Sequence, residues 1–212
     1  HDGSVFTVAL ADGSVLTVEK LLVATGRRAD PAAVGLDTVG LAKDAVKAFG
    51  EQEQASASLA VALKNQGIFA QETQNRMEEF SSSLQRVTTF GDEVITRVQT
   101  MLVNFRVAQE DIPRVTKATL DFASAMKVDV TTAAELMGKA NEGVTETLKR
   151  YGIIIDDAIP ESERFAAALA VIEGKFGGAA RAEAATYTGQ IKQLGNVWND
   201  LQEQIGSAIV PA

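Results

Sequence analysis

The spacing of apolar residues changes near residue 41, and this change constrains the fold more than any other feature. Before it, apolar and polar residues alternate with a period of two, which is typical of half-buried strands. After it, apolar residues recur every three or four positions, as on one face of a helix. We therefore expect a mainly α protein: a multi-helix assembly with long amphipathic helices (residues 42–212), preceded by a small N-terminal antiparallel β meander (residues 1–41).

The N-terminal region contains repeated hairpin signals. Asp-Gly occurs at residues 2–3 and again at 12–13, and this pair favours tight hairpin turns because both residues tolerate a positive φ. Apolar residues alternate over 5–10 and 15–18, whereas residues 21–24 form a continuous apolar run that ends near a glycine. Such a run is typical of a strand buried on both faces. These features predict a meander of three strands.

Two apolar series in the helical region step by alternating fours and threes, the spacing of a helix-packing seam. Gly91 interrupts the first series, and Gly91-Asp92-Glu93 fits either a kink or the end of one helix and the start of another. We expect each series to pack along a partner helix, within this chain or in another. The first series is Phe80, Leu84, Val87, Gly91, Val94, Val98, Met101 and Phe105, and the second is Tyr187, Ile191, Leu194, Trp198, Leu201, Ile205 and Ala208.

Shorter helices between these series have clear start and stop signals. Residues 110–113, Glu-Asp-Ile-Pro, predict a helix start, because carboxylates favour the positive end of a helix and proline needs no amide partner there. Thr132 and Glu135 fit a capping box. Gly152 fits the end of a short helix from Val144.

Charge and composition exclude several classes of function. The net charge of −8 and the lack of a Lys/Arg cluster argue against nucleic-acid binding. The chain has no cysteine and one histidine, His1, so thiolate metal sites, redox dithiols and most His-based mechanisms are excluded. No apolar run approaches the roughly 20 residues of a membrane span. Because the chain begins with His1 rather than Met, we expect a fragment or a processed chain.

Several polar or aromatic stretches resemble sites, but a structural role is favoured for each. Acidic residues within 156–163 are expected to solvate a loop and begin a helix rather than to act as acid/base pairs or cation ligands. Residues 174–178, Gly-Lys-Phe-Gly-Gly, lack the order of a phosphate loop and predict a hinge. Ser81–Ser83 predict a helix face or a frayed end. Tyr187 and Trp198 predict a core or an interface. We therefore expect no catalytic residue, no metal site and no cofactor.

Residues 1 to about 41 resemble the pyridine nucleotide-disulfide oxidoreductases, in particular the mercuric and glutathione reductase group. The resemblance is carried by "VFTVALADGSVLTVEKLLVATGRRAD" and "VGLDTVGL". It implies the end of an NAD-domain meander returning into an FAD domain, with Thr25, Gly26 and Arg27 near the flavin. The family's GxGxxG loop, CxxxxC redox pair and C-terminal His-Glu pair are missing, so we expect a remnant or fusion partner without hydride transfer. The alternative is an FAD-dependent oxidoreductase fragment with a foreign helical extension.

The remaining chain resembles the phage tail tape measure proteins, weakly from residue 42 and specifically from about residue 80. The segments that carry the resemblance follow the family's order: "LQRVTTFGDEVITRVQTMLVNF", "IPRVTKATLDFASAMKVDVTTAAELMGKA", "TLKRYGIII" and "VIEGKFGGAARAEAATYTGQIKQLGNVWNDLQEQIG". The resemblance implies a structural protein that extends through the tail tube and sets its length, without catalysis.

That family implies tail tube and tail assembly proteins as partners, and a location in the virion tail after assembly in the host cytoplasm. The seams add the expectation of self-association. A chimera, a recombination product or a mis-assembled reading frame would each account for the junction near residues 41–48.

Overall fold

The computed structural model describes residues 6–9, 15–18 and 38–210 of the chain, which divides into two units, residues 1–40 and 41–212. In the first unit, strands β1 (Phe6–Ala9) and β2 (Val15–Val18) pair antiparallel, with Phe6 opposite Val18. The expected turn at 12–13 and the expected third strand at 21–24 lie outside the described residues.

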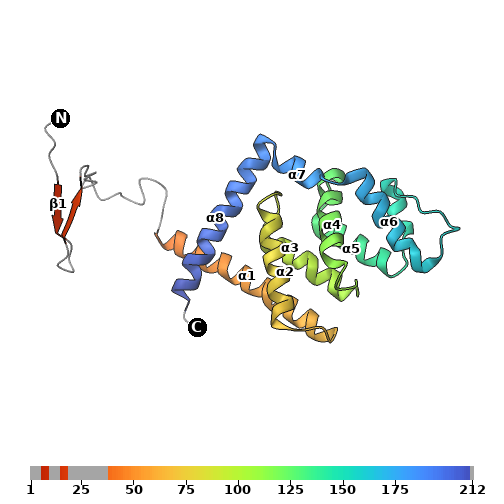
Figure 1. Ribbon diagram of the computed structural model, residues 1–212, viewed down its shortest axis with the longest axis horizontal. Helices are drawn as coiled ribbons and strands as arrows, with labels where there is room; N and C mark the ends of the chain where they lie inside the picture. Colours follow the sequence, from red (N-terminus) through yellow and green to blue (C-terminus); the bar gives the residue numbers. More distant parts are fainter. Residues whose placement is uncertain (1–5, 10–14, 19–37, 211–212) are drawn as a thin grey trace. The chain divides into compact units, whose positions relative to one another are not determined.

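Helices make up the described part of the second unit, so the expectation of a mainly α chain is confirmed (Figure 1). None of these helices is both long enough and apolar enough to cross a membrane. The elements are α1 (Thr38–Asn65), α2 (Gln71–Gln85), α3 (Asp92–Asn104), α4 (Ile112–Met126), α5 (Val130–Asn141), the 3-10 helix η1 (Glu146–Tyr151), α6 (Glu161–Phe176), α7 (Ala179–Ala184) and α8 (Tyr187–Ile209).

Helix α4 lies at the centre of the hydrophobic core and contacts α3, α5, α6 and α7. Its Phe122 is fully buried, and the ring meets Tyr151 and Phe176 edge-on, at centroid distances of 5.1 and 5.7 Å. Edge-to-face packing of this kind adds to the free energy of burial, because the positive edge of one ring faces the negative face of another. The core therefore connects α4 to η1 and α6 through aromatic contacts.

The apolar series from Phe80 to Phe105 is not one continuous seam. Helix α2 ends at Gln85 and α3 begins at Asp92, so the chain restarts a helix rather than kinking one. On α3 the buried apolar residues are Ile95, Val98 and Leu102, together with Val103, whereas the expected Val94 is only half-buried. The expected face is correct at Val98, which is buried, and at Met101, which packs against the core, but the buried stripe is displaced toward Ile95 and Leu102 because helix α3 starts anew after the break.

Ser81–Ser83 lie within α2, so the interpretation as a helix face is confirmed and that of a frayed end was wrong; Ser81 is fully buried and contacts Thr96 of α3. The Ser81 hydroxyl donates to the Met77 carbonyl (3.2 Å) and accepts from the Thr96 hydroxyl (3.0 Å). Gln99, also buried, donates to Ser81 and to the same Met77 carbonyl. Buried polar groups are stable only when they are hydrogen-bonded, and these side chains largely satisfy one another.

Helix α5 is capped by Asp129 rather than by the expected pair Thr132 and Glu135. The Asp129 carboxylate accepts from the backbone N–H groups of Thr131 (2.9 Å) and Thr132 (3.3 Å). A hydrogen bond from the Thr131 side chain, followed by these backbone hydrogen bonds, holds the pKa of Asp129 below its usual range. The capping box was wrong because Asp129 comes three residues earlier and already occupies the N-cap position.

Asp129→Ala is expected to lower the free energy of unfolding by about 1 kcal/mol, because two N–H groups at the helix start lose their acceptor. Urea unfolding at neutral pH measures the loss. Asp129→Asn is the control, since asparagine caps nearly as well. An equal loss in both variants would contradict the capping role.

Candidate functional site

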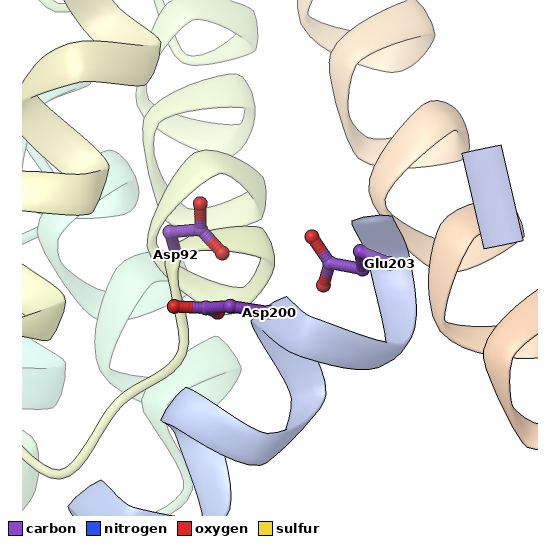
Figure 2. A group of neighbouring side chains, drawn as sticks. All are labelled: Asp92, Asp200 and Glu203. Carbon is purple, nitrogen blue, oxygen red and sulfur yellow. The ribbon is translucent and has the colours of Figure 1, made fainter. Parts of the chain in front are cut away.

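A polar cleft of about 850 Å³ lies between α1, the end of α2, the start of α3 and α8. Three carboxylates meet in it: Asp92 from α3, and Asp200 and Glu203 from α8. Figure 2 shows the three side chains turned toward a common space, with α1 on the far side of Glu203. One oxygen from each lies within 4.8 Å of the others. This cleft is the strongest candidate site in the described residues.

The position of α8 beside the cleft is fixed by a glycine and by the amide of a glutamine side chain. At Gly206, a Cβ atom would collide with the Ala45 carbonyl oxygen of α1, so only glycine permits this approach. Gln193 donates to the carbonyls of Arg86 and Thr88, at 3.1 Å each, just after α2 ends. Polar contacts and one close backbone approach, rather than a large apolar interface, therefore hold the inner face of α8.

Gln85 connects the two sides of the carboxylate cluster. Its amide nitrogen donates to both oxygens of Asp200, at 2.8 and 2.7 Å, and its amide oxygen accepts from the backbone N–H of Asp92. Ser82 donates to Asp92 (3.3 Å), and Asn199 donates to Glu203 (2.8 Å). Neutral donors thus surround the cluster.

The cluster has an unbalanced negative charge. None of the ion pairs found among residues 38–210 includes the three carboxylates. Burial, and then repulsion from Asp92 and Asp200, raises the pKa of Glu203 to about 7. Burial and Asp200 also raise the pKa of Asp92, against the opposing effect of the Ser82 hydrogen bond. The cluster therefore holds a proton near neutral pH, since like charges at this separation do not all ionise readily.

Two kinds of chemistry are open to such a cluster: proton uptake and the binding of a hard cation. Carboxylate oxygens are the donors that Ca²⁺ and Mg²⁺ prefer. The three oxygens leave most positions of a six- to eight-coordinate ion to water. The acidic cluster by itself does not assign an ion, whereas proton uptake follows directly from its geometry.

The free energy of unfolding is expected to fall between pH 5.5 and pH 8. The fall is on the order of 1 kcal/mol, a modest value because the Glu203 carboxylate is half-buried and partly screened by solvent. The folded-state pKa of about 7 lies above the unfolded value of about 4.3. Between these values the folded state binds more protons, so stability is highest at the acid end of the window and declines as Glu203 ionises.

Glu203→Gln removes the titrating carboxylate. Between pH 5.5 and pH 8 the free energy of unfolding of this variant should therefore fall by on the order of 1 kcal/mol less than that of the unmodified chain. Glu53→Gln, which removes an exposed carboxylate of α1, is the matched control and should leave the slope unchanged. Urea unfolding at both pH values measures all three proteins. If the free energy of unfolding of Glu203→Gln fell with pH as much as that of the unmodified chain, Glu203 would not be the group that titrates.

The other candidates from the sequence are not part of the cleft as the described residues define it. Thr25, Gly26 and Arg27 lie outside the described residues. The acidic stretch 156–163 is mainly exposed: Asp156 accepts from the backbone N–H of Ala158 (2.9 Å), and the stretch runs into α6. The interpretation as a loop and helix start is confirmed.

The glycines at 177 and 178 separate α6 from α7, so the expected break between helices is confirmed. The backbone N–H groups of Gly178 and Ala180 donate to the Asp121 carboxylate of α4, at 2.9 and 3.0 Å. N–H groups at a helix start attract anions. Here the chain supplies its own anion, and a carboxylate takes the place that a phosphate would occupy.

Sequence reasoning missed the carboxylate cluster, although a signal was present in α8. Polar residues recur by threes and fours on the side of the helix opposite the apolar series. They are Gln193, Asn196, Asp200, Glu203 and Ser207. This second stripe indicates a face that packs against polar groups, but it does not indicate that Asp92 lies opposite.

Comparisons with known proteins found no match. No family model matches the chain, and no similar curated protein or solved structure was found.

Proposed function

We propose that residues 42–212 are part of a phage tail tape measure protein and that their role is structural rather than catalytic. The observation that supports the proposal most is the ordered series of tape-measure-like segments between residues 84 and 206. Tail tube and tail assembly proteins are the proposed partners, and the virion tail is the proposed location.

The helical structure supports the same proposal. The resembling segments are helical over most of their length: the first includes all of α3, the second spans α4 and almost all of α5, and the last runs from within α6 through α7 and most of α8. Helices convert chain length into distance, at about 1.5 Å per residue. Since α4 packs against four neighbouring elements, we propose that this part acts as a folded module within a longer ruler.

An in-frame deletion in the phage or prophage that encodes the chain tests the proposal. Removing residues 42–212 should shorten the tails, by up to about 1.5 Å per residue if the module unfolds into a single helix inside the tube. Electron microscopy measures the tail length, and mass spectrometry of purified tails shows whether the chain is present. Tails of unchanged length that lack the chain would refute the proposal.

The alternative, an FAD-dependent oxidoreductase fragment, rests on the resemblance of residues 1–41. We expect the purified chain to show no flavin absorbance and no NAD(P)H-dependent reduction of an acceptor. Stoichiometric FAD with turnover would favour the alternative and refute a purely structural role.

A further inference from the structure

The outer face of α8 is the largest exposed apolar feature of the described helices. Six of its side chains are between 45 and 80% exposed, among them Tyr187 at 80% and Leu194 at 66%. Five of the six belong to the second apolar series expected from the sequence, the exception being Val197, and two of them, Leu194 and Val197, also border the cleft beside α1 and α2. The six are Tyr187, Ile191, Leu194, Val197, Trp198 and Leu201.

The order of residue types on this face matches a two-stranded seam. In heptad notation, Ile191, Trp198 and Ile205 occupy a positions, and Leu194 and Leu201 occupy the d positions between them. Isoleucine at two of the three a positions, with leucine at d, favours two parallel helices, and the larger Trp198 occupies the middle a position. The face is therefore complementary to a second copy of itself.

The charges of α8 favour such a pair. The flanking e and g positions, which usually carry the charges that select a partner, are uncharged here. They are Thr188, Gln190, Gly195, Val197, Gln202 and Gln204.

Among the charged residues of α8, only Asp200 borders this face, and its carboxylate accepts from Gln85 on the cleft side. Glu203 faces the cleft, and Lys192 pairs with Glu183 of α7 at 3.4 Å. Although the chain carries a net charge of −8, two copies that meet at this face bring no like charges together at the seam.

The exposed area is sufficient for a dimer. The six side chains together leave roughly 600 Å² of surface on each copy, since large apolar and aromatic side chains each expose on the order of 100 Å² here. A pair of copies that covered all of this surface would bury about 1,200 Å² in total, at the lower end of the range of specific interfaces. We propose that two copies of this chain pair in parallel through the outer face of α8, independently of the proposed tail function.

Sedimentation equilibrium over a range of concentrations tests the pairing. The unmodified chain is expected to dimerise with a dissociation constant in the micromolar range, and Leu194→Glu to weaken the dimer by about 100-fold or more. Ile154→Glu is the matched control: Ile154 is 72% exposed but follows η1, away from α8, so this variant should dimerise normally. Circular dichroism confirms that all three remain helical. A chain that stays monomeric at high concentration, or equal dimerisation of both variants, would overturn the proposal.

A single cysteine tests the orientation, because the chain has none of its own. In a parallel pair the two copies of position 194 face each other, so Leu194→Cys is expected to form a disulfide-linked dimer on mild oxidation. Lys192→Cys, at a position that points away from the seam, should remain largely monomeric. Dimerisation of the Leu194→Cys chain without cross-linking, or equal cross-linking of both variants, would overturn the parallel arrangement.

Discussion

Phe122→Ala is expected to lower the free energy of unfolding by about 3–5 kcal/mol, because it truncates the largest fully buried side chain of the core. Phe122 lies in α4, and its ring contacts Tyr151 of η1 and Phe176 of α6. Alanine would bury less apolar surface on folding, and it would leave a cavity that the closely packed neighbouring side chains fill only in part. Both aromatic contacts would be lost at once.

Urea unfolding followed by circular dichroism measures this effect. Phe69→Ala is the matched control, because it removes the same group from an exposed position after α1, where the ring lies 4.9 Å from the Lys64 ammonium. The control should cost less than about 1 kcal/mol. Similar losses in the two variants would show that Phe122 is not part of a tightly packed core.

Asp121→Ala is expected to cost about 2–3 kcal/mol, a loss second only to that of Phe122→Ala. The Asp121 carboxylate is 5% exposed and accepts from two backbone N–H groups at the start of α7, those of Gly178 and Ala180. Hydrogen bonds to a charged acceptor are about twice as strong as neutral ones. Without the carboxylate, the buried Ala180 N–H would have no partner, so the start of α7 should fray.

Asp121→Asn and Asp157→Ala separate the possible causes. Asparagine keeps one acceptor oxygen and should restore part of the stability, while Asp157→Ala removes an exposed carboxylate and should have little effect. Hydrogen exchange at the Ala180 amide gives a local measurement and should accelerate most in Asp121→Ala and remain unchanged in Asp157→Ala. Unchanged exchange at Ala180 would contradict the proposed contact.

Features encoded within a few residues were predictable from the sequence. Pro113 lies at the start of α4 as expected, and Gly152 ends η1 in the left-handed conformation that glycine favours. The existence of most helices and the polar role of the 156–163 loop follow from the same kind of local signal. Which residues of α3 face the core was not fully predictable, because this depends on how the chain turns between Gln85 and Asp92 before the helix begins.

Contacts between distant segments could not be predicted from spacing. Gln85 and Asp200 are 115 residues apart, and Asp121 and Ala180 are 59 apart. Each pair meets only after several helices have packed, so a single sequence contains no periodicity that links them. The carboxylate cluster belongs to this class, whereas the outer seam of α8 was visible because all its residues lie on one helix.

The two sides of α8 have separate physical roles. The inner side titrates, since the ionisation of Glu203 changes how firmly the helix is held. The outer side is apolar and is the face through which we propose that two copies of the chain pair. Leu194 and Val197 of the outer side also border the cleft that holds Asp200 and Glu203, so changes made to the two sides of α8 are expected to influence one another rather than to add.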